Sequence, residues 1–321
     1  MNAIETHALT RQYGKLTAVQ SLNLSVPQGS LYGLIGPNGA GKTTTLRMLA
    51  GLLEPTTGEI FINDQPINQN LTELRRQIGF MPDFFGVYDD LVVWEYLDFF
   101  ARCYDLPAKR RRQVIDELLE LVDLSDKKTA FVHTLSRGMR QRLCLAHAMV
   151  HDPQVLLLDE PASGLDPRAR VEMRELLREL GAMGKTVVLS SHILSELAEL
   201  CDSIGIIERG QLVVSGKLDE IRAHLQEGRK IRMRVLSDSE TAETTLREQP
   251  GIGEISFPKN GNGTPILGGG TDIEVNFLGD EDAVANLLES LIRNQVRIAS
   301  FTETHTGLEE VFLRLTKGEV Q

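Results

Sequence analysis

The chain contains little cysteine, with three residues in 321 and no CxxC pair. Cys103, Cys144 and Cys201 are too few and too scattered for a disulfide framework or a zinc site, so a reducing cytosol fits. No apolar run approaches the roughly 18–20 residues that span a bilayer. The first residues also lack a long apolar core, and we therefore expect no signal peptide. The protein is predicted to stay outside the membrane while remaining able to bind a membrane protein.

Positive charge is also scarce, because 34 Lys and Arg residues face 45 Asp and Glu residues and give a net charge of −11. Binding to nucleic acid phosphates needs a basic face, so we expect no nucleic acid partner. The one dense basic run, residues 109–112, begins a helix-like stretch and is interpreted as a solvated face. The remaining composition, 41% apolar and 25% charged, is ordinary for a globular protein of this length with two domains.

Strands and helices alternate over most of the chain. The pattern predicts a buried strand at 31–35, a helix after residue 42, mainly helix over 84–150, and strands at 155–158 and 186–190 with a helix after each. This alternation is typical of an α/β fold with a parallel sheet. We expect one domain over residues 1–225, with a helical subdomain at about 84–150. Residues 226–321 are expected to form a small α+β, ferredoxin-like βαββαβ domain, with an exposed loop at 258–270 and a last helix at 307–318.

The segment GPNGAGKT at residues 36–43 matches the phosphate-loop motif GxxxxGK[ST] between a predicted strand and a predicted helix. Its glycines allow backbone N–H groups to converge on phosphate oxygens, and the helix start attracts the same anion. Lys42 is expected to contact the β- and γ-phosphates, and the Thr43 hydroxyl to ligate Mg²⁺. The predicted nucleotide-binding residues of this loop are Gly36, Pro37, Asn38, Gly39, Ala40, Gly41, Lys42, Thr43 and Thr44.

Two acids follow the apolar strand at 155–158, at the sheet edge where α/β folds bind ligands. Asp159 is expected to hold Mg²⁺ through water, and Glu160 to polarise the attacking water as a general base. His192 ends the next predicted strand and is expected at the same edge as a catalytic residue. The cofactors predicted by these groups are ATP and Mg²⁺.

The segment LSRGM at 135–139 provides a second helix start suited to an anion, since Ser136 is a good N-cap. The ordered motifs GPNGAGKTT, LSRGM, LLLDEP, SGLD and His192 resemble the ATP-binding subunits of ABC transporters over residues 1 to about 225. The resemblance implies that Tyr13 stacks on adenine and that two subunits enclose ATP head to tail. Residues Ser136, Arg137, Gly138 and Met139 would then act on the ATP of the partner copy. Asp166 would lie in the same interface and cap a helix that begins at Pro167.

The resemblance implies an ATPase that powers transport through a separate permease, as a homodimer or pseudo-homodimer at the cytoplasmic face of the cell membrane. The signature form and the C-terminal domain favour an exporter, and an importer subunit remains the alternative. The family usually carries Gln where this chain has Asp83, so its role as a metal ligand stays open. Core packing of the helical subdomain explains most aromatic residues of the segment at about 83–104. The resemblance also makes this segment the expected permease contact, with Phe85, Tyr88 and Trp94 as candidate anchors.

Other classes of P-loop protein fit the sequence less well. A chromosome-type ATPase would need a long coiled coil between the phosphate loop and LSRGM, and the spacing leaves no room for one. A translation factor of this superfamily carries two cassettes, whereas this chain shows one. A free-standing P-loop kinase or GTPase lacks the LSRGM, LLLDEP and His192 set.

Overall fold

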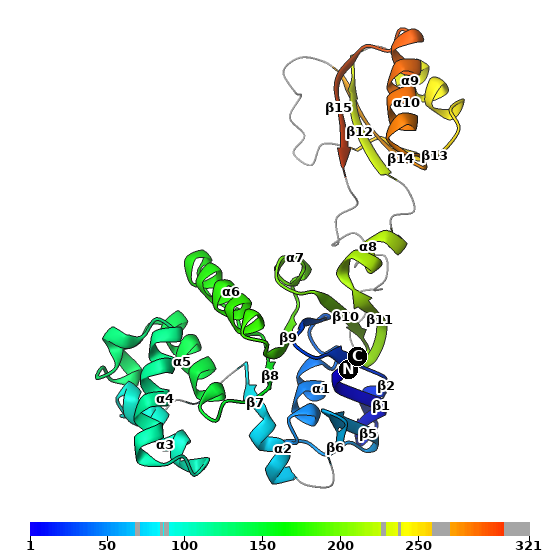
Figure 1. Cartoon of the computed structure of the whole chain (residues 1–321). Coiled ribbons are helices and arrows are strands. Elements are labelled where there is room, and N and C mark those ends of the chain that lie inside the picture. Colours follow the sequence, from blue (N-terminus) through cyan, green and yellow to red (C-terminus); the bar gives the residue numbers. More distant parts are fainter. Residues whose placement is uncertain are drawn as a thin grey trace. The chain divides into compact units, whose positions relative to one another are not determined.

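The computed structural model describes residues 1–67, 71–83, 86, 90–225, 229–236, 239–258 and 270–304. The chain divides into two compact units, one spanning Met1–Leu218 and the other beginning at Asp219 (Figure 1). The expected domain boundary at residue 225 lies at the end of a helix, α8 (Leu218–Leu225), that groups with the second unit. Each unit has its own hydrophobic core, and each is described separately below.

A six-stranded sheet in the order β11-β10-β4-β9-β8-β7 forms the centre of the first unit. All neighbouring strands are parallel except the β10–β11 pair at one edge. Apolar runs form the five parallel strands because both of their faces are covered, as parallel sheets require, whereas the antiparallel edge strand alternates exposed and half-buried residues. Their bounds are β4 (Leu31–Ile35), β7 (Ile78–Met81), β8 (Val155–Leu158), β9 (Thr186–Ser191), β10 (Ser203–Glu208) and β11 (Gln211–Lys217).

An antiparallel sheet covers one side of this unit. It consists of β1 (Asn2–Tyr13), β2 (Leu16–Leu22), β3 (Ser25–Pro27), β5 (Thr57–Ile62) and β6 (Gln65–Pro66). Its apolar side chains share one core with those of the central sheet and of helix α1 (Lys42–Leu49). The phosphate-loop segment therefore joins two elements, β4 and α1, that are anchored in that core. Helix α2 (Leu71–Gln77) follows this sheet and precedes β7.

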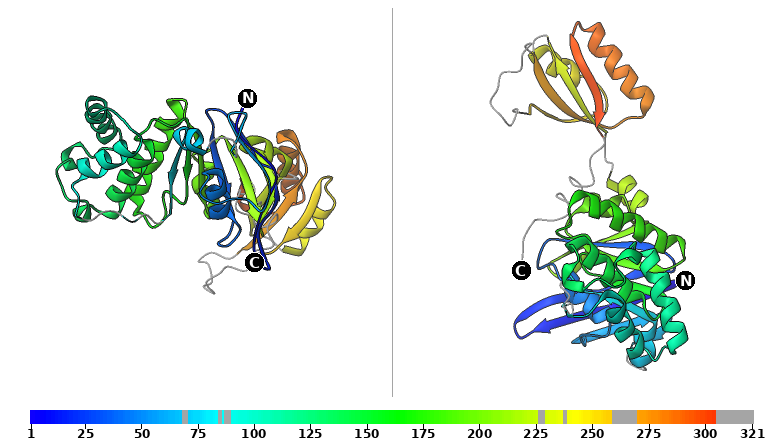
Figure 2. Two further views of the ribbon diagram at one scale, coloured as in Figure 1. Left: turned by 90° about the horizontal axis from the view of Figure 1, so that it is seen from below. Right: turned by 90° about the vertical axis from the view of Figure 1, so that its left-hand side faces the viewer.

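Helices gather at the other side of the first unit, away from β1 and β2 (Figures 1 and 2). Helices α3 (Val93–Cys103), α4 (Ala108–Leu121) and α5 (Arg137–Met149) contact one another. They lie within the stretch predicted to be helical, whereas residues 84, 85 and 87–89 lie outside the described residues. Helix α6 (Pro167–Ala182) precedes β9, and α7 (Leu194–Ala198) follows it. None of the described helices is both long and apolar enough to cross a bilayer.

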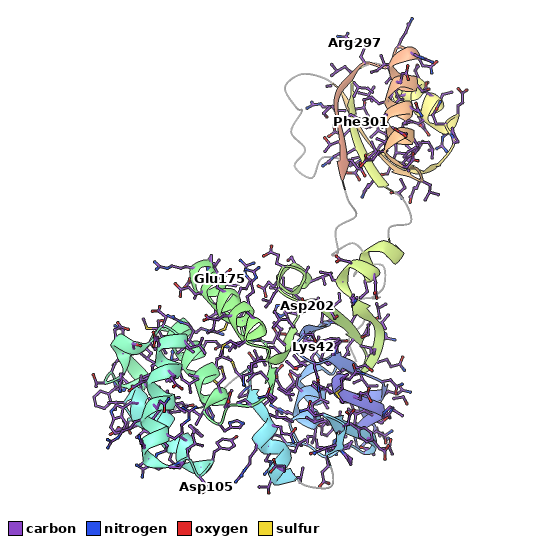
Figure 3. All side chains as sticks on the ribbon, in the orientation of Figure 1. Lys42, Asp105, Glu175, Asp202, Arg297 and Phe301 are labelled. Carbon is purple, nitrogen blue, oxygen red and sulfur yellow. The ribbon has the colours of Figure 1, made fainter. Side chains whose placement is uncertain are left out.

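The second unit contains a four-stranded antiparallel sheet in the order β13-β14-β12-β15. After α8, its elements are β12 (Arg229–Val235), α9 (Ser239–Arg247), β13 (Ile252–Ser256), β14 (Thr271–Phe277), α10 (Glu281–Arg293) and β15 (Ile298–Thr304). Alternating strand residues such as Ile231, Met233 and Val235 form a core with Leu246 and Leu291 of the two helices. Figure 3 shows Phe301 on this sheet. The predicted helix at 307–318 and most of the predicted loop at 258–270 lie outside the described residues.

Candidate active site

The loop between β4 and α1 is shaped by glycines that no other residue replaces without a clash. A Cβ on Gly36 would lie 2.2 Å from the Ile207 carbonyl oxygen. Gly41, the residue before α1, has a φ of +105°, and a Cβ there would lie 2.5 Å from the Ala18 carbonyl oxygen. The backbone can therefore approach its neighbours closely, and the start of α1 is left open to an anion. This cradle fits the phosphates of a nucleotide.

Lys42 begins α1 and is nearly buried. Its Nζ donates hydrogen bonds to the carbonyl oxygens of Gly36 at 2.7 Å and Pro37 at 3.2 Å. It also lies 3.5 Å from Oε1 of Glu160. Burial lowers the pKa of the Lys42 ammonium, and the charge of Glu160 opposes this shift. Figure 3 shows this cation inside the first unit.

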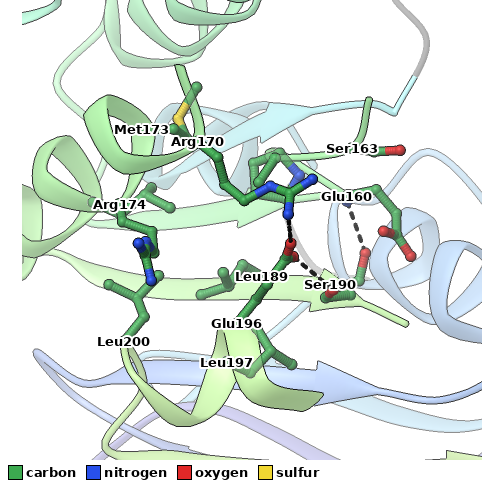
Figure 4. Close-up of a pocket in the computed structure, with 14 residues that line it drawn as sticks. Glu160, Ser163, Arg170, Met173, Arg174, Leu189, Ser190, Glu196, Leu197 and Leu200 are labelled. Carbon is green, nitrogen blue, oxygen red and sulfur yellow. Dashed lines mark hydrogen bonds and ion pairs between the residues drawn. The ribbon is translucent and has the colours of Figure 1, made fainter. Parts of the chain in front are cut away.

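The acids after β8 and the histidine after β9 meet because the two strands are parallel neighbours. Asp159 is 1% exposed, and its Oδ1 accepts a hydrogen bond from the Ser190 hydroxyl at 2.7 Å. The same hydroxyl accepts one from the Glu160 backbone N–H at 2.9 Å (Figure 4). His192 Nδ1 lies 3.0 Å from Glu160 Oε2. The Glu160 carboxylate therefore contacts Lys42 on one oxygen and His192 on the other.

A cleft of about 530 Å³ brings most of the predicted nucleotide site together. It is lined by Tyr13, Leu16, Ala18, Asn38, Gly39, Ala40, Gly41, Lys42, Thr43, Thr44, Asp83, Glu160, Ser163 and His192. Gly36 and Pro37 are not among these residues, but both contact the Lys42 ammonium. The cleft thus combines an anion cradle, a cation, a carboxylate with a histidine partner, and an exposed aromatic ring.

The side chains expected to bind Mg²⁺ offer oxygen atoms, the ligands that this ion prefers. Thr43 and Asp83 line the cleft, and Asp83 is exposed. Asp159 is not among the described lining residues and is bonded to Ser190. Of the three residues predicted to serve the metal, Thr43 and Asp83 therefore lie at the cleft, and Asp159 lies beside Ser190.

Tyr13 ends β1 at the mouth of the cleft, and its side chain is 45% exposed. The Arg11 guanidinium lies over its ring at 4.7 Å from the centroid. Arg11 is itself held by a 2.8 Å hydrogen bond from Nη1 to the Glu54 carbonyl oxygen. Arg11 does not line the cleft, so the cation stabilises the ring orientation from outside the cleft.

The segment LSRGM begins α5, and the structure confirms Ser136 as its N-cap because the Ser136 hydroxyl accepts a hydrogen bond from the Met139 N–H at 3.2 Å. Asp166 caps α6 in the same way through the Ala169 N–H, with Pro167 as the first helical residue. Residues 136–139 do not line the described part of the cleft in their own chain. The Arg137 guanidinium instead contacts the Ser163 carbonyl oxygen at 3.0 Å.

A smaller pocket beside Glu160 links the loop after β8 to the segment after His192 (Figure 4). Arg170 on α6 forms an ion pair with Glu196 on α7 at 3.1 Å, although the groups are not aligned as a hydrogen bond. Arg170 Nη2 also donates to the Leu165 carbonyl oxygen at 3.4 Å, and Glu196 accepts from the Ser191 hydroxyl at 3.4 Å. These contacts stabilise the geometry on which Glu160 and His192 depend.

Sequence reasoning missed several contributors to the site. Ser190 bonds both acidic residues after β8, and Ser163 lines the cleft. Gly210 donates its N–H to the Ala40 carbonyl oxygen at 2.9 Å and so stabilises the phosphate loop. The position of Ser190, two residues before His192, was a usable signal. The contribution of Gly210 had none, because it comes from the β10–β11 turn, far away in the sequence.

This fold and this cleft define a P-loop nucleotide-binding protein of the ABC ATPase class. The family model described as "ABC transporter" matches residues 19–163. The Nod factor export ATP-binding protein I of Burkholderia lata is 36% identical over 319 residues, covering 99% of this chain and 98% of that protein. The bacitracin transport ATP-binding protein BcrA of Bacillus licheniformis is 35% identical, covering 98% and 97%. The chain therefore belongs to the ABC transporter ATP-binding proteins.

Some other matches cover about two thirds of the chain. An uncharacterized ABC transporter ATP-binding protein of Nostoc is 42% identical over 209 residues, which cover 64% of this chain and 62% of that protein. A solved ATP-binding subunit of an ABC transporter is 32% identical with a TM-score of 0.63, covering 69% of this chain and 92% of its own. A dimeric bacterial ABC transporter cassette is 28% identical with a TM-score of 0.62, covering 67% and 98%.

Proposed function

We propose that this chain hydrolyses ATP to power export through a separate membrane permease. The observation that carries the proposal is the contact of the Glu160 carboxylate with both Lys42 and His192 inside a nucleotide-sized cleft. Relatives covering nearly the full length are named as an export and a transport ATP-binding protein. These names support the exporter reading over the importer alternative.

In the proposed reaction, Glu160 accepts a proton from a water molecule that attacks the γ-phosphorus. The bond between that phosphorus and the bridging oxygen breaks, and ADP leaves with the electron pair. His192 orients the Glu160 carboxylate through its 3.0 Å contact, and Lys42 neutralises charge on the phosphates. Tyr13 stacks on the adenine, and residues 36–44 hold the phosphates.

We further propose Mg²⁺ as the metal, bound by Thr43 and reached by Asp159, with Asp83 as an additional oxygen ligand. The cleft supplies hydroxyl and carboxylate oxygens, which fit this ion. When bound, Mg²⁺ neutralises charge on the phosphate oxygens. The replacement of the usual Gln by Asp83 adds a negative charge near the phosphates, and this charge strengthens the demand for a cation there.

The active form is proposed to be a dimer with ATP enclosed between two copies. The capped start of α5 carries a partial positive charge of about +0.5, and it is directed by Ser136, Arg137, Gly138 and Met139 toward the γ-phosphate of the other copy. Asp166 is proposed to lie in the same interface. A dimeric cassette among the similar structures supports this assembly. ATP then closes the dimer, and hydrolysis opens it.

The permease is proposed to contact residues at about 83–104. Among the candidate anchors, Trp94 on α3 is 38% exposed, while Phe85 and Tyr88 lie outside the described residues. This contact would hold the protein peripherally at the cytoplasmic face of the membrane. Residues 1–225, which are the first unit together with α8, are proposed as the ABC domain. The second unit is proposed to be a ferredoxin-like accessory domain, because its strand order follows that of a split βαβ sandwich.

The substitution Glu160→Gln tests the proposed chemistry, since an amide keeps the side-chain size and removes the proton acceptor. We expect ATP binding to persist, kcat to fall at least about 100-fold, and ATP to drive the chain into a dimer. Glu59→Gln, on an exposed position of β5, is the matched control and should leave all three measurements unchanged. Turnover within a few fold of wild type would remove Glu160 from the role of base.

A further inference from the structure

Arg137, the first residue of α5, is tightly joined to the loop before α6. Its Nη2 donates a 3.0 Å hydrogen bond to the carbonyl oxygen of Ser163, 26 residues away. The next residue, Gly164, has a φ of +65°, and a Cβ built on it would lie 2.3 Å from the same Nη2. The guanidinium therefore occupies the space beside Gly164 that a side chain would need.

This loop is also part of the nucleotide site of the same chain. Ser163 lines the cleft, and its N–H donates a 3.0 Å hydrogen bond to the Glu160 carbonyl oxygen. Glu160 is the proposed base. Two successive hydrogen bonds, through the two backbone groups of Ser163, thus connect the residue that acts on the chain's own ATP to the start of α5.

The contact between Arg137 and Ser163 is a hydrogen bond and not an ion pair. Its acceptor is a neutral carbonyl, and Arg137 forms no ion pair among the residues that the structure describes. The surrounding backbone leaves little slack, because a Cβ on Gly138 would lie 2.9 Å from the Cβ of Ala169 on α6. Arg137 and Gly138 at the start of α5 therefore both lie against the segment that contains Ser163 and the first turn of α6.

We propose that Arg137 is a positioning residue that couples the two ATP sites of the dimer. This proposal rests on the proposed dimeric function, in which Ser136 faces the ATP of the other copy. Arg137 makes the start of α5 respond to the state of the nucleotide cleft in its own chain. The coupling element is the Glu160–Ser163–Arg137 connection. Within LSRGM, Arg137 supplies the guanidinium that this connection needs.

The experiment measures the initial rate of ATP hydrolysis by the full-length chain against ATP concentration. For wild type we expect a Hill coefficient clearly above 1, with an upper limit of about 2 for two sites. Arg137→Gln removes the guanidinium, and Gly164→Ala displaces it without altering Arg137. Both should lower the Hill coefficient to about 1, and the double variant should lower it no further, because both changes break one contact.

Gly184→Ala is the matched control. Gly184 shares the left-handed backbone, with a φ of +81°, but a Cβ there meets no atom within 4 Å. It should therefore reproduce any backbone strain while keeping the wild-type Hill coefficient. Thermal unfolding of each variant shows whether its fold is intact.

Wild-type cooperativity in both folded single variants, or additive effects in the double variant, would overturn the coupling role. A folded Gly164→Ala protein that behaves like Gly184→Ala would overturn it as well. The dimeric function is judged separately, by whether Glu160→Gln forms ATP-dependent dimers. If those dimers form while Arg137→Gln and Gly164→Ala remain cooperative, only the role of Arg137 is wrong.

Discussion

At the residue scale, Lys42, Glu160 and the neighbouring Asp159 are each oriented by another polar group. Lys42 is held by two carbonyl oxygens and Glu160, and Glu160 by His192. The Asp159 carboxylate and the Glu160 backbone share the single hydroxyl of Ser190. Such mutual restraint reduces the reorganisation needed when charge develops during phosphoryl transfer. The groups of the site therefore hold one another in place, and Ser190 does so without taking part in the proposed reaction.

The same logic applies to Tyr13, whose exposed ring is oriented by Arg11. We predict that Arg11→Gln raises the KM for ATP about two- to fivefold, which is the value of an exposed cation–π contact, while kcat stays within about twofold. Lys15→Gln is the control, because Lys15 is an exposed cation in the same hairpin. Steady-state kinetics in wild-type and Tyr13→Leu backgrounds would check it. An Arg11 effect that persists without the tyrosine ring would contradict the explanation.

At the scale of elements, the local order of strand, phosphate loop and helix could be predicted from the sequence because apolar runs and glycines determine it directly. The N-caps at Ser136 and Asp166 could also be predicted from the sequence. Strand β7 was not predicted, because its four residues become a strand only through pairing with β8, more than seventy residues later in the chain. The hydrogen bond between Arg137 and Ser163 could not be predicted for a similar reason, because side-chain contacts between distant segments leave no periodic pattern in the sequence.

Helices α3 and α5 are joined by aromatic contacts that make the first unit sensitive to acid. The ring of His147 stacks on that of Phe100 with the ring centroids 3.6 Å apart. Just beyond the ends of the two helices, His151 stacks on Tyr104 with a centroid distance of 3.8 Å. Burial, and then the nearby His151, lower the pKa of His147 from 6.5 to about 4. Between these values the unfolded chain binds a proton that the folded chain does not. The stability from neutral His147 is thus complete above pH 6.5 and is lost as the pH falls toward 4.

We therefore predict that His147→Phe, which cannot be protonated, flattens the pH dependence of unfolding. Between pH 7 and pH 5 the wild type should lose about 2 kcal/mol of unfolding free energy more than the variant does. Urea unfolding of the full chain at the two pH values measures the difference. His133→Phe serves as the control, because His133 is an exposed histidine of the same unit. Equal losses in wild type and His147→Phe would show that His147 titrates normally in the folded protein.

At the scale of the whole molecule, the chain consists of two units with separate cores. The nucleotide cleft is lined only by residues between Tyr13 and His192 in the described part of the chain, so we expect bound ATP to stabilise the first unit. A ligand stabilises the cooperative unit that binds it. Nucleotide should therefore reveal whether the two units unfold independently.

We predict two calorimetric transitions for the Glu160→Gln protein, of which ATP with Mg²⁺ shifts one. At a free ATP concentration about 100 times the Kd, binding adds about 2.7 kcal/mol, which raises the Tm of a unit of this size by roughly 5–10 °C. Lys42→Ala in the same background, which lacks the phosphate-binding cation, should lose most of this shift. A concerted rise of both transitions would mean that the second unit is energetically coupled to the nucleotide site. In that case its sheet would have to be counted as part of the ATP-responsive structure rather than as an independently stable domain.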